Sequence, residues 1–233
     1  SITSISISLV LSLLLLAPQL SQLGRAEAIS VHRLMSFSWP FLFTSLTAFL
    51  LSQADLWLVG FFSAEHDVAY YGAAMRITLL STMPLAIVNA VIPPFLAERH
   101  TVGDHRGMEA ILRSTSLVAF LPAFALFVAY WVFGAEILDL VFSTGYAQGA
   151  PILLVLTGGY LVQIFCGSPS YTLMMTGNQK AMMAITLAAA ALMIGAGAMG
   201  AKLFGPIGIA WGSFIGLSSQ SIAMWLWVRL RLG

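Results

Sequence analysis

Two charged side chains, Asp55 and Arg76, interrupt stretches of sequence that are otherwise apolar. Asp55 precedes the polar turn at Glu65 by ten residues, and Arg76 follows it by eleven. In membrane-spanning helices, a rise of about 1.5 Å per residue places both charges about 15 Å from that turn. We therefore expect either an ion pair between antiparallel neighbours, or two charges facing one water-filled cavity for an anionic or proton-coupled substrate.

Uncharged polar side chains interrupt the apolar stretches as well. An amide inside a membrane helix either lines a cavity or bridges two helices, and bridging is the commoner role. Gln220 is one such amide, and Lys180 stands at the end of an apolar stretch. The candidates for lining a substrate cavity are Arg76, Asp55, Asn89, Gln53, Gln163 and Lys180.

No group of residues in the sequence has the spacing that catalysis or metal binding requires. The histidines His32, His66, His100 and His105 stand in polar links without metal-ligand spacing. The single cysteine, Cys166, permits neither an internal disulfide nor a cysteine metal site. No glycine-rich phosphate or dinucleotide loop occurs. The sequence predicts no enzyme, no cofactor and no metal.

The composition identifies the elements that must position these residues. The 233 residues are 59% hydrophobic and 8% charged, against about 45–50% and about 25% in soluble domains. This excludes a soluble enzyme and a nucleic-acid-binding protein. We expect an all-α, polytopic membrane bundle of about seven spans, because only a helix satisfies its own backbone in lipid. The predicted spans are Ile2–Leu20, Phe37–Phe62, Val68–Ala97, Ser114–Phe133, Ala150–Thr176, Ala181–Phe204 and Pro206–Val228.

The links between these spans differ in charge, which predicts their orientation. One alternating set carries eight Lys and Arg residues, and the other set carries only Lys202. Basic residues mark the cytoplasmic side. The basic set consists of Ser21–Ser36, Glu98–Arg113, Gly177–Lys180 and the C-terminus, which we therefore expect in the cytoplasm. The periodicity of Glu98–Arg113 predicts a short helix on the membrane surface.

Prolines and glycines indicate where the helices bend and pack. Pro84, Pro122 and Pro169 fall inside predicted spans, and an interior proline kinks a helix, so they are the candidate hinges. Pro93 and Pro94 are expected to end a span. Small residues four apart let another helix approach closely. The candidates for such packing are Gly208, Gly212 and Gly216.

Five segments, in this order and spacing, resemble the polysaccharide (O-antigen type) flippases of the multidrug/oligosaccharidyl-lipid/polysaccharide exporter superfamily. The runs DLWLVGFF and VAYYGAAMRI, which contain Asp55 and Arg76, are similar to the seventh and eighth spans of that family. PPFLAE, LMMTGNQK and FGPIGIA are similar to three later turns. The resemblance covers Val31 to Arg229 and is to the C-terminal half of such a protein.

The resemblance implies two six-helix lobes around a central cavity. It implies that residues 37–233 form the second lobe, and that residues 1–36 are the end of a preceding span and a cytoplasmic link. The implied activity is movement of an undecaprenyl-pyrophosphate-linked oligosaccharide across the bacterial inner membrane by alternating access, driven by ion gradients. The implied partners are membrane lipid, the missing N-terminal lobe, a glycan polymerase and glycosyltransferases. Arg76 matches a recurring basic position of the family.

Two other functions stay open. A multidrug or cation antiporter of the same superfamily needs acidic cavity residues, and Asp55 alone fits that role. A non-transporting scaffold or polymerase subunit of glycan assembly is the other alternative. Such enzymes usually carry a large outer loop, whereas the longest outer link here, Gly134–Gly149, has 16 residues. Either a fragment of a longer protein or a natural half-size protein agrees with the sequence.

Overall fold

The computed structural model describes residues 39, 46–47, 49, 53–102 and 105–231. Apart from Trp39, these residues belong to one compact unit, Pro40–Gly233. The described part is helical and contains no strand. Four helices are long and apolar enough to cross a membrane, over Glu65–Phe95, Ala110–Phe142, Tyr146–Cys166 and Gln179–Phe204. The chain is thus an all-α polytopic membrane protein, as the composition predicts.

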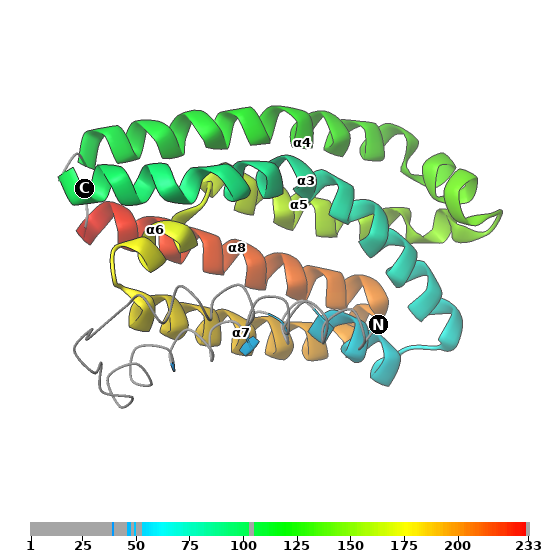
Figure 1. The fold of residues 1–233 in the computed structure, drawn as a ribbon. Coiled ribbons are helices and arrows are strands. Elements are labelled where there is room, and N and C mark those ends of the chain that lie inside the picture. Colours follow the sequence, from blue (N-terminus) through cyan, green and yellow to red (C-terminus); the bar gives the residue numbers. More distant parts are fainter. Residues whose placement is uncertain (1–38, 40–45, 48, 50–52, 103–104, 232–233) are drawn as a thin grey trace, which may run out of the picture. The chain divides into compact units, whose positions relative to one another are not determined.

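Two long helical hairpins are connected through a central helix (Figure 1). After a helix over residues 53–62, the elements are α3 (Glu65–Val102), α4 (His105–Phe142), the 3-10 helix η1 (Tyr146–Gly149), α5 (Ala150–Cys166), α6 (Pro169–Met175), α7 (Gln179–Phe204) and α8 (Pro206–Arg231). The helix α3 packs along α4, and α7 packs along α8. The helix α5 contacts α3, α4 and α8 and so connects the hairpins.

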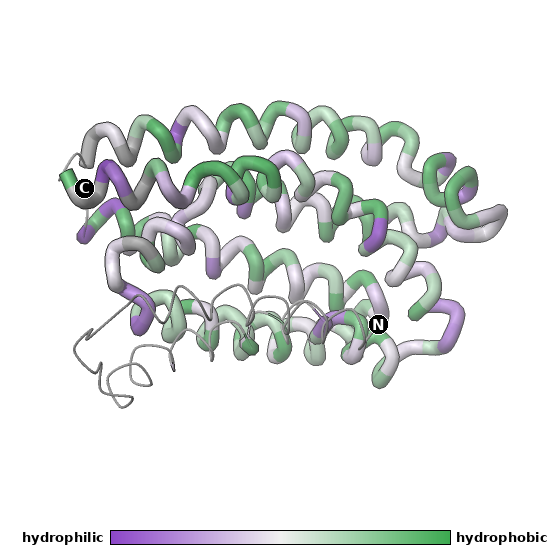
Figure 2. Tube along the Cα trace, in the orientation of Figure 1, coloured by the Kyte–Doolittle hydropathy of each residue, from purple (hydrophilic) through white to green (hydrophobic). Residues whose placement is uncertain are grey.

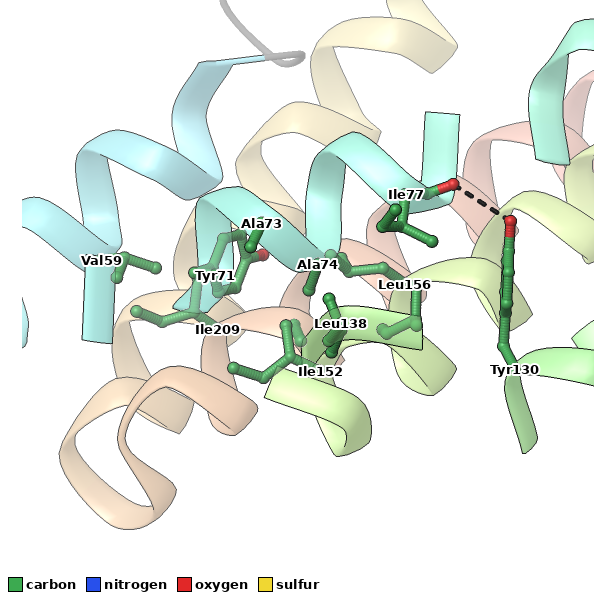
Figure 3. Packing of buried hydrophobic residues seen from close by; sticks show 12 residues of the cluster. Val59, Tyr71, Ala73, Ala74, Ile77, Tyr130, Leu138, Ile152, Leu156 and Ile209 are labelled. Carbon is green, nitrogen blue, oxygen red and sulfur yellow. Dashed lines mark hydrogen bonds between the residues drawn. The ribbon is translucent and has the colours of Figure 1, made fainter. Parts of the chain in front are cut away.

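The largest core cluster lies where residues 53–62, α3, α4, α5 and α8 meet (Figure 3). Val59, Tyr71, Leu138 and Ile209 are fully buried there. The hydroxyl of Tyr130 on α4 donates to the backbone oxygen of Ile77 on α3 at 3.3 Å. Hydrophobic residues occupy most of each helix (Figure 2), and many large ones are exposed, as expected for surfaces in lipid.

Two of the predicted spans lie wholly or largely outside the described residues. Nothing of Ile2–Leu20 is described, and Phe37–Phe62 is described mainly over residues 53–62. The helix α8 covers the last predicted span, but it is not among the four candidates for crossing the membrane. Serines and Gln220 in its middle reduce its mean hydropathy.

The helices α3 and α4 are longer than predicted, and this corrects the prediction for the link between them. The apolar span ends at Phe95, directly after Pro93 and Pro94, as predicted, but the helix α3 continues to Val102. Within Glu98–Arg113, the predicted surface helix is instead the last turn of α3 and the first turns of α4. The apolar segments end at Phe95 and begin again at Ala110. Charged helical turns therefore extend beyond the apolar segments, because a helix can continue into water.

The backbone of α4 leaves helical geometry at Phe133 (φ −121°, ψ 16°), not at the predicted position, Pro122. Pro84 likewise stands inside the continuous α3. Residues 134–142, predicted to be a link, are helical. Asp139 stabilises the following turn, since its Oδ1 accepts the backbone N–H groups of Gly145 (3.1 Å) and Ala147 (2.8 Å). The hinge roles of both prolines stay predictions.

The predicted span Ala150–Thr176 is broken rather than kinked. Gly167 has φ +78° and separates α5 from α6. Pro169 is the first residue of α6, and a residue before proline, here Ser168, disfavours helical geometry. The hydroxyl of Ser168 donates to Oδ1 of Asn89 on α3. The predicted span is therefore two helices rather than one kinked helix, and a hydrogen bond joins the break to α3. The hinge role of Pro169 stays a prediction.

Replacing Gly167 with alanine is expected to destabilise the protein more than replacing Gly177. Both glycines have positive φ, at which a Cβ costs about 1–2 kcal/mol. A Cβ on Gly167 would collide with Oγ of Ser116, whereas nothing lies within 4 Å of one on Gly177. Thermal melting in detergent should show an excess cost of about 1–3 kcal/mol. A Ser116→Ala background should remove most of it; equal melting of the two glycine variants would contradict the contact.

Candidate functional site

Asp55 belongs to the helix over residues 53–62 and is buried where that helix meets α3 and α8, with 5% of its surface exposed. Its Oδ2 accepts hydrogen bonds from the hydroxyl of Tyr71 at 3.2 Å and the hydroxyl of Ser213 at 3.5 Å. Its Oδ1 accepts the backbone N–H of Leu56 at 3.0 Å. Neutral donors from three helices therefore hold this carboxylate.

A cavity of about 320 Å³ lies beside Asp55, between α3, α5, α6, α7 and α8. Its polar lining consists of Asp55, Tyr160, Gln163, Ser170, Thr186, Ser213 and Gln220. Four methionines, Met75, Met182, Met193 and Met224, contribute to the apolar lining. Nε2 of Gln220 donates to Oγ1 of Thr186 at 3.1 Å, so this amide bridges α8 and α7 at the cavity wall.

Arg76 lies on the exposed face of α3 and is not part of this cavity wall. Within the described residues it forms no ion pair with Asp55, so the predicted pairing is wrong. The reason is rotation about the helix axis. Tyr71, which contacts Asp55, and Arg76 are five residues apart, which places them about 140° apart around α3. The exposed face around Arg76 is apolar and contains Leu80, Met83 and Ile87.

The other predicted cavity residues lie in three different surroundings. Gln163 lines the cavity beside Asp55. Asn89 is bonded to Ser168 at the break between α5 and α6. Gln53 is half-buried and Lys180 is exposed at the start of α7, and neither lines this cavity. No three His, Cys, Asp or Glu side chains in the described part of the chain could together hold a metal ion.

The cavity depends on close contact between α7 and α8. A Cβ on Gly200 would lie 2.5 Å from the backbone oxygen of Gly208, and one on Gly212 would lie 2.5 Å from Cα of Gly197. A Cβ on Gly216 would lie 2.5 Å from Cβ of Met193. Gly208 and Gly212 of α8 therefore touch α7 backbone to backbone, and Gly216 packs against the side chain of Met193, which places Ser213 and Gln220 at the cavity.

Sequence reasoning missed Tyr71 and Ser213 as hydrogen-bond partners of Asp55, and it missed Tyr160 and Thr186 as residues of the cavity wall. Serine and threonine are common in membrane helices because their hydroxyl groups can bond to their own backbone, and tyrosine often counts as part of an apolar stretch, so none of these residues stands out. Ser213 carried one usable signal, because it follows Gly212 in the glycine series. The others became recognisable only once the helices were packed.

Comparison with known proteins identifies one family. A model of the MatE family matches residues 40–198. Among curated proteins, a probable low-salt glycan biosynthesis flippase, Agl15, of Haloferax volcanii is 21% identical over 134 residues. That alignment covers 58% of this chain and 28% of the relative, so the chain spans well under two thirds of that protein. No solved structure matches the chain.

Proposed function

The chain belongs to the MatE family of membrane transporters, and on this premise we propose that it forms one lobe of a flippase for lipid-linked oligosaccharides. In this proposal an undecaprenyl-pyrophosphate-linked repeat unit, of O-antigen or exopolysaccharide, crosses the bacterial inner membrane by alternating access. The C-terminus is cytoplasmic, and a second lobe completes the transport pathway. Glycosyltransferases and a glycan polymerase would supply and consume the substrate.

The position of Arg76 is the observation that carries this proposal. A guanidinium deep in a span costs at least about 2.5–3.5 kcal/mol when it faces lipid. Arg76 is exposed on this lobe and has no ion-pair partner among the described residues. It therefore fits a water-filled pathway between this lobe and another. Guanidinium binds phosphate through paired hydrogen bonds, which suits a pyrophosphate-linked substrate.

The cavity beside Asp55 supports a second candidate, a multidrug or cation antiporter. A buried carboxylate, the ring of Tyr160 and four methionines would suit an organic cation, since aromatic rings attract cations and methionines adapt to varied shapes. This candidate would make Asp55, not Arg76, the side chain that contacts substrate. The named relative is described as a probable glycan biosynthesis flippase, which favours the first candidate.

Deleting the gene and restoring it as the full-length protein distinguishes the two. For a flippase, we expect loss of surface glycan, accumulation of lipid-linked glycan on the inner leaflet, and unchanged resistance to cationic drugs. In that case, a deletion strain that carries the full-length protein with Asp55→Asn should show the same drug resistance as the strain with the unchanged protein. Normal surface glycan together with drug sensitivity, reproduced by Asp55→Asn, would overturn the flippase proposal in favour of the antiporter.

A further inference from the structure

The short helix α6 closes the end of the cavity that lies furthest from Asp55. Asp55 bonds to Ser213 on α8, and Met224 lines the cavity eleven residues further along the same helix, which is about 16 Å away. Leu173 of α6 belongs to one buried cluster with Met224, and Ser170 of α6 lines the cavity. Figure 1 shows α6 at the end of the bundle where α7 begins. The helix α6 is therefore the end wall of the cavity.

Glycines with positive φ separate α6 from both neighbouring helices. Gly167, with φ +78°, follows α5, and Gly177, with φ +77°, precedes α7. A glycine changes its φ and ψ at low cost because it has no Cβ. When a segment of a protein swings, a few residues at the ends of its elements absorb the change in φ and ψ. The seven residues of α6 can therefore turn as one unit while α5 and α7 stay in place.

The contacts that hold α6 in this position can be exchanged at low cost. The hydroxyl of Ser168, directly before α6, donates to Oδ1 of Asn89 on α3. Leu173 packs with methionines of α7 and α8, and methionine side chains adapt to shifted neighbours. The hydroxyl of Thr172 is buried at 1% exposure and has no hydrogen-bond partner among the described residues. A buried hydroxyl without a partner favours any arrangement in which water reaches it.

We propose that α6 is a lid on the cavity beside Asp55. The lid pivots at Gly167 and Gly177, and the hydrogen bond from Ser168 to Asn89 holds it closed. Opening withdraws α6 from the cavity wall, so that water reaches both the buried face of α6 and the cavity behind it. The lid controls access to the cavity whatever the cavity binds, so it does not rest on the proposed transport function.

Chemical labelling of single cysteines measures how often the lid opens. In the full-length protein, with its native cysteines, Cys166 included, replaced by serine, one reporter is Thr172→Cys on the lid. The other is Met224→Cys on the cavity wall that the lid covers, where 3% of the side chain is exposed. The rate at which a small charged thiol reagent modifies each reporter follows the population of the open form. Asn89→Ala and Ser168→Ala each remove the closing bond, so each should raise both rates about two- to tenfold.

Three controls separate a lid from general loosening. Ser168→Thr keeps the hydroxyl and should leave both rates close to their starting values. Ser219→Ala removes a hydroxyl that bonds within α8, to the backbone oxygen of Gly216, and should not change them. Val59→Cys, at a fully buried position of the largest core cluster, should stay unreactive in every variant. Where Asn89→Ala melts early, Ser168→Ala carries the test.

Three outcomes would overturn the proposal. Unchanged rates in both Asn89→Ala and Ser168→Ala would show that their hydrogen bond does not hold a lid closed. An equal rise at Val59→Cys would show that the whole helical bundle loosens. Faster reaction of Thr172→Cys without faster reaction of Met224→Cys would show that α6 moves but does not cover the cavity.

Discussion

Replacing Arg76 with alanine in the full-length protein is expected to reduce glycan export by roughly tenfold to a hundredfold. Hydrogen bonds to a charged group contribute about 1.5–3 kcal/mol. In the proposed pathway, the group that would lose these hydrogen bonds is the substrate pyrophosphate. Surface glycan, measured against the amount of transporter in the membrane, should fall by the same factor.

Three companion variants separate charge from structure. Arg76→Lys should retain part of the activity, since the charge remains but the paired hydrogen bonds are lost. Leu80→Ala changes the same exposed face without removing charge, and Lys202→Ala removes a charge near a helix end. Both should export glycan at close to the normal rate. Normal export by Arg76→Ala, at normal abundance, would show that this guanidinium does not contact substrate.

The Arg76 and Asp55 pair shows what a membrane sequence predicts and what it omits. Counting residues from the turn predicts how deep each charge lies, because helix rise is constant. Residue counting does not predict the direction in which each side chain points. Arg76 lies five residues after Tyr71, so it points away from Asp55, which Tyr71 contacts. Only the packing of α3 against its neighbours shows which face of α3 is buried. The all-α class, the helix order and the glycine contacts follow from local sequence patterns. The cavity, by contrast, requires side chains from the helix over residues 53–62 and from α3, α5, α6, α7 and α8.

Breaks in helices were the weaker part of the prediction, for a related reason. Proline removes one hydrogen bond, and whether the helix then kinks, breaks or continues depends on what satisfies the freed groups. At Pro84 and Pro122 the helix continues. Before Pro169 it breaks, because Gly167 accepts a positive φ and Ser168 bonds to Asn89 on another helix. The sequence shows where each proline lies, but the residue that stabilises a break, here Asn89, is known only from the tertiary structure.

Two alanine substitutions on α7, five residues apart, are expected to change stability in opposite directions. A Cβ on Gly200 would lie 2.5 Å from the oxygen and 2.8 Å from the carbon of the Gly208 carbonyl. No rotamer change relieves a contact between two backbones, so α7 and α8 must move apart. We expect Gly200→Ala to cost about 1–3 kcal/mol or more. Gly195→Ala meets nothing within 4 Å and should gain about 0.5–1 kcal/mol from the better helix propensity of alanine.

Thermal unfolding in one detergent measures both substitutions on the same scale. The loss in Gly200→Ala should extend to the cavity, because α8 carries Ser213 and Gln220, whose bonds to Asp55 and Thr186 need the close approach. The mobility of a probe attached to α8 should therefore increase in Gly200→Ala and stay unchanged in Gly195→Ala. Equal stability of the two variants would mean that α7 and α8 are not in backbone contact at Gly200.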